Sequence, residues 1–308
     1  MPMIGAFFKK IFVKRVDCAV SLVHHLSNSE RKGRIFAVGD LHGEYDALMQ
    51  ALRALAFDFG KDRVLLVGDI HDRGRNSEKC LDLLREPWAD SVLGNHELML
   101  LESIDEDGAL MGSGCSAVEM WMANGGEWAL GAPQHNRADW RRLVLDSVPL
   151  NWVVERKDGR KVVVCHAEPD PDWLADVVAL KNRPIPVSQL RGAITVWGRR
   201  ILRTAGDDEM PRQQKQHLLS HVEGVLFSVH GHTQIKTAGW VNNLLFVDTG
   251  AVFGNRLTLV DLDHAIPGRS NGIYAWDIAS ERLLGYAATR LFSDPKSAGR
   301  PYDAKSSA

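Results

Sequence analysis

Five short motifs in the sequence combine acidic, imidazole or amide side chains with small residues that allow a tight turn. They read GDLHG at residues 39–43, GDIHDRG at 68–74, GNHE at 94–97, CHA at 165–167 and GHT at 231–233. Any one of them is typical of a polar turn after a β-strand. Five in order along one chain, each with side chains that can ligate a metal, indicate a common site.

The first two motifs place carboxylates where metal ligands are expected. Asp40 and His42 are two residues apart in a tight turn, so both can point at one ion. Asp69 follows the next strand at the equivalent place. Because a carboxylate has two oxygens, Asp69 could bridge two cations.

The later motifs add uncharged ligands. Asn95 offers an amide oxygen, and His166 and His232 can each supply an imidazole to the same pair of ions. A ligand set that mixes oxygen with imidazole suits Mn, Fe or Zn better than a set of oxygens alone.

Three more polar residues of these motifs suggest chemistry on a phosphate group. Asp72 and Arg73 place an acid beside a guanidinium, whose fork of N–H donors matches phosphate oxygens. His96 stands beside Asn95 and is free to act as an acid.

The elements that must position these residues are short runs rich in β-branched side chains. Apolar residues at helical spacing, such as Leu48 and Leu52, lie between the first three runs. The first third is therefore predicted to be β-α-β-α-β with parallel strands, whose ligands bind beyond the carboxyl ends. We expect strands at residues 34–40, 64–69, 91–95, 161–166, 225–230, 244–248 and 257–262.

The rest of the chain is less regular. Residues 97–150 are predicted to be largely helical, and residues 200–222 to form a helix-containing insertion. Residues 273–278 and 283–287 could add a final hairpin. We find no repeat and no clear linker, so we expect one domain.

Together the motifs resemble those of the phosphoprotein phosphatase family of calcineurin-like metallophosphoesterases, in particular its phage lambda and bacterial serine/threonine phosphatase type. The resemblance runs from about residue 34 to residue 262 and includes WMANGG at 121–126, VWGR at 196–199 and DTGAV at 248–252. It implies an α/β fold: a calcineurin-like β-sandwich flanked by helices, with a β-α-β-α-β metal-binding scaffold.

The resemblance also implies a role for each motif residue. His96 would be the general acid oriented by Asp72, Arg73 and Arg199 would bind the phosphate, and Glu97 would pair with Arg73. Two divalent ions, Mn²⁺ by expectation with Fe or Zn as alternatives, would activate a water molecule. The implied metal ligands, with Asp69 as the bridge, are Asp40, His42, Asp69, Asn95, His166 and His232.

Two histidines stand outside this assignment. His71 occupies a position where relatives usually carry a small or aliphatic residue, and we interpret it as a tolerated side chain near the mouth of the site. A catalytic or third-metal role is the alternative for His71. His230 precedes His232 by two residues, and we interpret it as a supporting or core residue.

The segments outside the resemblance are predicted to be an N-terminal extension at residues 1–33 and a disordered tail at 291–308, around a domain at 34–290. Residues 1–20 lack the uninterrupted apolar stretch of a signal peptide or a transmembrane helix. A helix packed on the domain is our preferred interpretation, and contact with a membrane surface is the alternative.

Composition limits the partners. The 308 residues are 45% hydrophobic and 25% charged with a net charge of −2, so no nucleic-acid partner is expected. The four cysteines form no CxxC pair, and we expect free thiols and a cytoplasmic location. We expect a monomer that acts on a phosphoprotein or phosphopeptide.

Serine/threonine protein phosphatase is the preferred function, with symmetrical dinucleoside tetraphosphate hydrolase as the alternative. The latter branch usually lacks the Asp of the DRG motif and reads GNHD, whereas this chain keeps Asp72 and Glu97. A binding module without catalysis is disfavoured, because every expected ligand is present.

Overall fold

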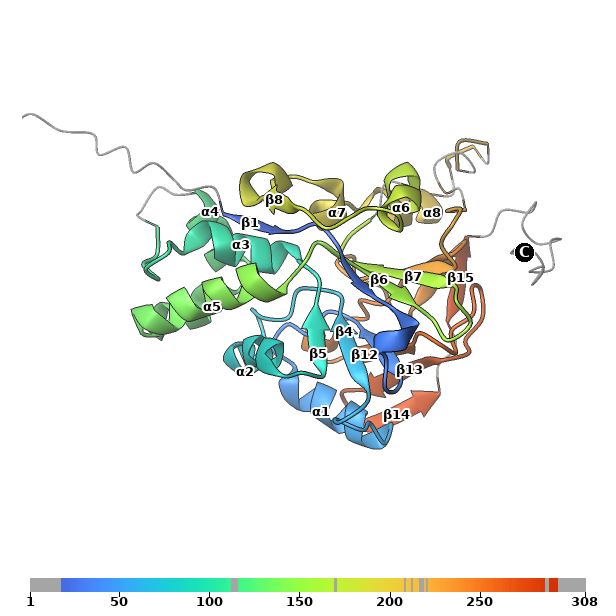
Figure 1. The fold of residues 1–308 in the computed structure, drawn as a ribbon, viewed down its shortest axis with the longest axis horizontal. Helices are drawn as coiled ribbons and strands as arrows, with labels where there is room; N and C mark the ends of the chain where they lie inside the picture. The colour runs from blue at the N-terminus through green and yellow to red at the C-terminus, as the bar shows by residue number, and fades with distance from the viewer. Residues whose placement is uncertain are drawn as a thin grey trace, which may run out of the picture.

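Two β-sheets form the centre of the molecule, and a short pair of strands makes a third, separate sheet (Figure 1). The structure is a computed structural model that describes residues 18–111, 116–168, 171–207, 209–211, 213–215, 219, 221–285 and 288–292. Residues 1–17 of the predicted extension and 293–308 of the predicted tail lie outside this part of the chain.

The six-stranded sheet carries the predicted β-α-β-α-β unit. Its order is β14-β13-β12-β3-β4-β5, with β3, β4 and β5 parallel. The crossover helices are α1 (Tyr45–Ala54) and α2 (Ser77–Asp82), as predicted. The strands are β3 (Ile35–Val38), β4 (Arg63–Leu66), β5 (Ala89–Ser91), β12 (Arg256–Asp261), β13 (Ile273–Asp277) and β14 (Arg282–Gly285).

The seven-stranded sheet has the order β15-β10-β11-β9-β7-β6-β2. It mixes parallel pairs, such as β7 with β9, with antiparallel ones, such as β6 with β7. Its strands are β2 (His24–Leu26), β6 (Asn151–Glu155), β7 (Lys161–Cys165), β9 (Phe227–His230), β10 (Gly239–Val241), β11 (Leu244–Phe246) and β15 (Thr289–Phe292).

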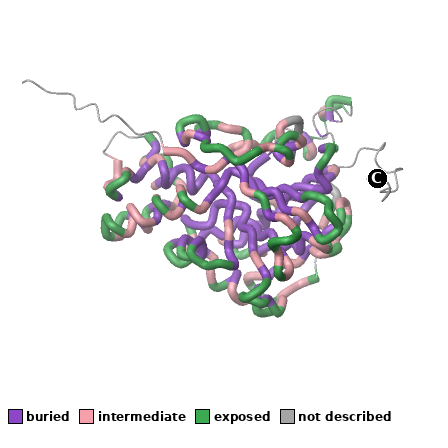
Figure 2. Tube along the Cα trace, viewed as in Figure 1, coloured by how far each residue is buried: buried purple, intermediate pink, exposed green. Residues whose placement is uncertain are grey.

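The two sheets bury one face of each against the other, which makes a sandwich. Ile35 and Ala37 of β3 share a buried cluster with Val162 and Val164 of β7. Alternate residues of the same strands, such as Phe36, belong to the outer cluster that includes the apolar faces of α1 and α2. This period of two is what a strand buried on both faces requires, and Figure 2 shows the buried centre.

Helices cover the outer faces. Residues 97–150 are largely helical, as predicted, and α3 and α5 lie beside the six-stranded sheet at the left of Figure 1. None of the described helices has both the length and the apolar character needed to span a membrane. Besides α1 and α2, the described helices include α3 (Asn95–Ser103), α4 (Ser116–Ala123), η3 (Gly126–Gly131), α5 (Gln134–Ser147), α6 (Pro171–Val177), α7 (Ile194–Trp197) and α8 (Arg200–Gly206).

One predicted strand is wrong at its carboxyl end. We expected a strand over residues 91–95, but β5 ends at Ser91 and α3 begins at Asn95. The cause is a helix cap, because the Glu97 carboxylate accepts the N–H of Gly94 at 2.8 Å. The helix start therefore includes Asn95 itself.

Part of the predicted N-terminal extension packs into the fold. β1 (Ala19–Ser21) pairs with β8 (Pro184–Pro186), and β2 pairs with β6. Leu22 and Val23 between them are buried in the outer cluster. The domain boundary at residue 34 stays a prediction, and the contribution of this segment to stability is measurable.

We expect Leu22→Ala to lower the free energy of unfolding by about 2–5 kcal/mol, the usual cost of truncating a buried leucine. Leu22 is 3% exposed, whereas Leu130, 53% exposed, provides a matched control. Leu130→Ala should change the free energy by about 0.5 kcal/mol or less. Equal, small effects in chemical denaturation would show that residues 18–26 do not belong to the cooperative unit.

Candidate metal centre

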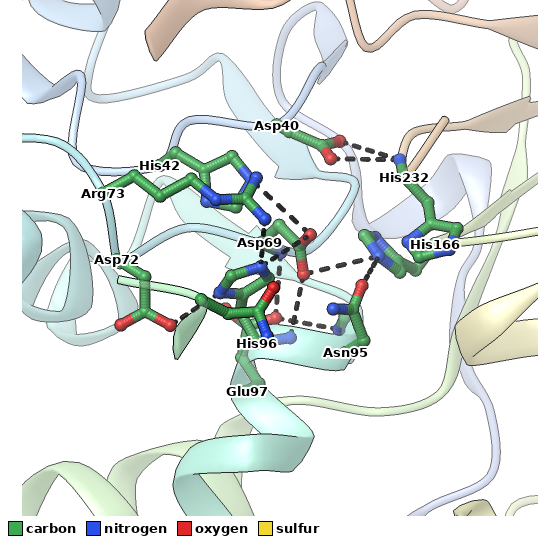
Figure 3. A network of polar contacts seen from close by, with 12 residues as sticks. Asp40, His42, Asp69, Asp72, Arg73, Asn95, His96, Glu97, His166 and His232 are labelled. Atoms are coloured by element: carbon green, nitrogen blue, oxygen red, sulfur yellow. Dashed lines mark hydrogen bonds and ion pairs between the residues drawn. The ribbon is translucent and has the colours of Figure 1, made fainter. Parts of the chain in front are cut away.

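The predicted ligands meet at one edge of the sandwich. Asp40, Asp69, Asn95, His166 and His232 follow β3, β4, β5, β7 and β9, and each is at most 5% exposed. In Figure 3 the Asp69 carboxylate lies between His42 and His96 on one side and His166 and His232 on the other. The carboxyl ends of the strands thus bring together motifs that are far apart in sequence.

The backbone is strained at this edge. Among the described residues, five of the eight non-glycine residues with positive φ are His42, Asp69, Asp72, Arg73 and His232, with φ between 43° and 71°. Each such conformation costs on the order of 1–3 kcal/mol and persists only where the surroundings impose it. This clustering marks the site as functional rather than as an ordinary set of turns.

Two glycines allow the carboxylates to approach the backbone. A Cβ at Gly94 would lie 2.3 Å from Oδ1 of Asp69, and one at Gly231 would lie 1.9 Å from Oδ1 of Asp40. The amide N–H of His232 can therefore donate to Oδ2 of Asp40 at 3.0 Å. A side chain at either glycine would displace a predicted ligand.

Asp69 faces two separate groups of ligands. Its Oδ2 lies 3.6 Å from Nε2 of His42, and its Oδ1 lies 3.4 Å from Nε2 of His166. Asp69 forms one group with His42 and His96 and another with His166 and His232, and the ligand atoms of each group lie within 4.8 Å of one another. The geometry suits a carboxylate shared by two ions.

The imidazoles have the tautomer that metal binding needs. Nδ1 of His42 lies 2.9 Å from the carbonyl oxygen of His71, and Nδ1 of His166 lies 2.7 Å from that of Val67. Since a carbonyl oxygen only accepts, Nδ1 carries the hydrogen and the lone pair is on Nε2, toward Asp69. Burial lowers the pKa of His42 to about 3, so this ring is neutral and able to ligate.

Two further buried groups of the site, the His232 ring and the Asp40 carboxylate, have surroundings that favour bound cations. Neither ring nitrogen of buried His232 makes a hydrogen bond of normal geometry. Burial, together with the nearby Asp248 and Asp69 carboxylates, raises the pKa of Asp40 well above its usual range. Divalent ions would relieve this repulsion between buried carboxylates.

Asp248 is a site residue to which we assigned no role from the sequence. It follows β11 and is 8% exposed, and burial raises its pKa to about 6. The signal was present, because DTG at residues 248–250 follows a strand in the same way as the assigned motifs.

Arg73 lies across the first group of ligands. Its Nη1 donates to Nε2 of His42 at 2.6 Å and its Nη2 donates to Nε2 of His96 at 3.0 Å. The Nε2 lone pairs of His42 and His96 therefore already face a positive charge, the guanidinium of Arg73.

The expected pairing of Glu97 with Arg73 is wrong. No ion pair joins them among the described residues; instead, Glu97 accepts the amide N–H groups of Asp69, Ile70 and Gly94 at 2.8–2.9 Å. The reason is local, since Glu97 lies in the first turn of α3, where a carboxylate caps free amides. Glu97 fixes the backbone that carries Asp69.

Asp72 contacts His96 as the resemblance implied. Its Oδ2 lies 2.6 Å from Nδ1 of His96, which leaves Nε2 of that ring directed at the ligand group. The indole N–H groups of Trp121 and Trp128 also donate to Asp72, at 2.9 and 2.6 Å. The four residues form one polar cluster beneath the site, in which Asp72, His96 and Trp121 are buried and Trp128 is partly buried.

Arg199 is not part of this hydrogen-bonded cluster. It is exposed and lines a cavity of about 390 Å³ together with Trp197, whose ring centroid lies 6.5 Å from that of His232. Arg199 thus lies beside the second ligand group, at the surface.

The two unassigned histidines are both completely buried. For His71 this contradicts the expected place near the mouth of the site, because the ring points down onto Asp72. His230 bonds to the hydroxyl of Ser228 at 2.6 Å and to the carbonyl of Ala167 at 2.9 Å, so both of its ring nitrogens are engaged.

The match to a protein-family model identifies the class of enzyme to which the chain belongs. The model of the calcineurin-like phosphoesterase family matches residues 33–250, more than half of the chain. The chain belongs to this family. It is therefore a metal-dependent phosphoester hydrolase.

Relatives within the family have two kinds of name. The chain is 30% identical over 229 residues, 73% of its length and 90% of the relative, to serine/threonine-protein phosphatase 1 of Salmonella typhimurium strain LT2. It is 46% identical over 76 residues, 24% of its length and 27% of the relative, to the symmetrical bis(5'-nucleosyl)-tetraphosphatase of Dechloromonas aromatica strain RCB.

A solved structure described as a putative diadenosine tetraphosphatase shares the fold. The TM-score is 0.53 at 21% identity, over 86% of this chain and 96% of that chain. This similarity supports the calcineurin-like architecture described above.

We expect the purified phosphoesterase to bind two divalent ions per chain and to lose turnover in excess chelator. The two ligand groups that share Asp69 are the reason. Metal analysis with parallel assays measures both quantities. Activity that persists in chelator with no ion bound would contradict the two-ion assignment.

We further expect Asp69→Asn to reduce turnover and metal content more than Asp40→Asn. Asp69 faces both ligand groups, whereas Asp40 receives the N–H of His232 and faces one side of the site. The two variants lose the same charge and are matched in size. Equal losses at saturating metal would show that Asp69 does not serve both groups.

Proposed function

We propose that this phosphoesterase is a serine/threonine protein phosphatase with two bound divalent ions, Mn²⁺ by expectation, acting on phosphoproteins in the cytoplasm. The observation that carries the proposal is the hydrogen bond between His96 and Asp72 beside the ligand groups. A serine or threonine alkoxide is a poor leaving group, so its departure requires a positioned acid. The name of the Salmonella relative supports the same substrate class.

The proposed acid is Nε2 of His96. Because Nδ1 donates to Asp72, the ring is fixed with Nε2 toward the site, 3.8 Å from Oδ2 of Asp69. In the imidazolium form, Nε2–H can be donated to the departing oxygen, and the ionised Asp72 stabilises the charge. A neutral ring held in this orientation would only accept a proton there.

The proposed phosphate ligands are the two arginines. Arg73 already points its guanidinium into the site, toward His42 and His96. Arg199 would approach the phosphoryl oxygens from the cavity rim beside His232. Bound divalent ions would supply Lewis acidity and lower the pKa of a water molecule for attack on phosphorus.

A second function is symmetrical dinucleoside tetraphosphate hydrolysis. The name of the Dechloromonas relative supports this function, and the sequence similarity to that relative covers 24% of the chain. Its leaving group is a nucleoside diphosphate, which departs without strong help from an acid, so the buried Asp72–His96 pair would contribute less. The pair therefore favours the phosphomonoester of a protein.

Kinetics on three substrates test the choice directly. A phosphoserine peptide, a phosphotyrosine peptide and a dinucleoside tetraphosphate should be assayed with one metal-loaded preparation. We expect the largest kcat/KM on the phosphoserine peptide. A larger value on the dinucleoside tetraphosphate would move the protein to the second function.

We expect His96→Asn to lower turnover about 10²- to 10⁴-fold while metal content is unchanged, because that is the usual contribution of a positioned acid. The loss should be larger on a phosphoserine peptide than on p-nitrophenyl phosphate, whose nitrophenolate leaves without a proton. Equal losses, with chemistry rate-limiting, would exclude His96 as the acid. Loss of bound metal would make it a ligand.

A further inference from the structure

His71 packs against the polar cluster beneath the site. It follows Asp69 by two residues and has no exposed surface. Its ring packs edge-on against Trp121 and Trp128, with centroids 6.4 and 5.8 Å apart, and against His96 at 6.4 Å. A polar ring in such a place needs a hydrogen-bond partner to offset its desolvation.

That partner is Asp72. Nδ1 of His71 lies 2.7 Å from Oδ1 of Asp72, while Nδ1 of His96 lies 2.6 Å from Oδ2. Each oxygen also accepts one indole N–H, from Trp128 on Oδ1 and from Trp121 on Oδ2. The carboxylate therefore has two donors on each oxygen, and His71 and His96 hold opposite ends of it.

Space filling alone does not account for this residue. Nε2 of His71 has no hydrogen-bond partner, and the nearest carboxylate oxygen, Oε1 of Glu97, is 3.6 Å away. An unpaired buried nitrogen is costly, and an aliphatic side chain of similar size would avoid the cost. The benefit must therefore come from the other nitrogen, which contacts Asp72.

We propose that His71 is a positioning residue for phosphoester cleavage, because its Nδ1–H holds the plane of the Asp72 carboxylate so that Oδ2 stays aligned with His96. The inference rests on the proposed function, in which His96 protonates the departing oxygen. His71 itself touches neither the phosphate nor the leaving group. Its effect should depend on how strongly the leaving group needs the proton.

Three substitutions separate the hydrogen bond from packing. In His71→Asn the amide nitrogen takes the place of Nδ1, whereas in His71→Gln it reaches toward the place of Nε2. His71→Val removes both. We expect the Val and Gln variants to lower kcat about 10- to 100-fold on a phosphoserine peptide, but less than about threefold on p-nitrophenyl phosphate. The kcat of the Asn variant should stay within about threefold of the parent on both substrates.

Two further readouts test the contact with Asp72, one by resonance without turnover and one by turnover in a double-mutant cycle. In metal-free protein, the indole N–H resonance of Trp128 should differ between His71→Asn and His71→Val, because both variants lack the ring that packs on Trp128 but only Asn keeps a donor to Oδ1 of Asp72, which Trp128 shares. In a double-mutant cycle, His71→Val should cause no further loss once Asp72→Asn is present. Metal content should be the same in all variants.

The outcomes distinguish this inference from the function on which it rests. Suppose that the parent cleaves the phosphoserine peptide. If the His71→Asn and His71→Gln variants then have the same kcat, or if His71→Val lowers kcat equally on the peptide and on p-nitrophenyl phosphate, His71 does not act through Asp72. A Trp128 resonance at the same position in His71→Asn and His71→Val would also overturn the inference. If the parent does not cleave the peptide, the proposed function fails, and the same variants are compared on an alkyl and an aryl phosphate.

Discussion

The site depends on one constraint: the Asp69 carboxylate must face two groups of ligands from a strained backbone. Glu97 meets this constraint by accepting three amide N–H groups, two of them from Asp69 and Ile70. A capping residue of α3 thus connects β4 to the helix that carries Asn95 and His96. Because these amides are buried, loss of the carboxylate would leave them unpaired, and the positive φ of Asp69 would have little to maintain it.

The β-sandwich brings the candidate ligands of both sheets to one edge. Parallel strands β3, β4 and β5 bring Asp40, Asp69 and Asn95 to one edge, and β7 and β9 of the second sheet bring His166 and His232 to the same edge. The six-stranded sheet contributes the acidic and amide ligands together with the imidazole of His42, and the seven-stranded sheet contributes the imidazoles of His166 and His232. Packing of the two sheets against each other therefore brings the candidate ligands together.

Much of this arrangement was predictable from sequence, because β-branched runs ending in Asp, Asn or His indicate both a strand and its ligand. The short strands were not predictable: β2 is the triplet HHL, and it forms only because β6 lies beside it. The partner of Glu97 also depended on three-dimensional proximity, since the motif GNHE does not show which amides lie near. The burial of His71 required the tryptophans of α4 and η3, which are fifty or more residues away.

The central claim is that two ions share Asp69. Anomalous diffraction from crystals of the Mn²⁺-loaded protein tests it most directly, because it locates the ions without an assay. The account predicts two peaks, one contacting Asp69 with Asp40 and His42 and the other contacting Asp69 with Asn95, His166 and His232. A single peak, or two peaks of which only one contacts Asp69, would contradict it.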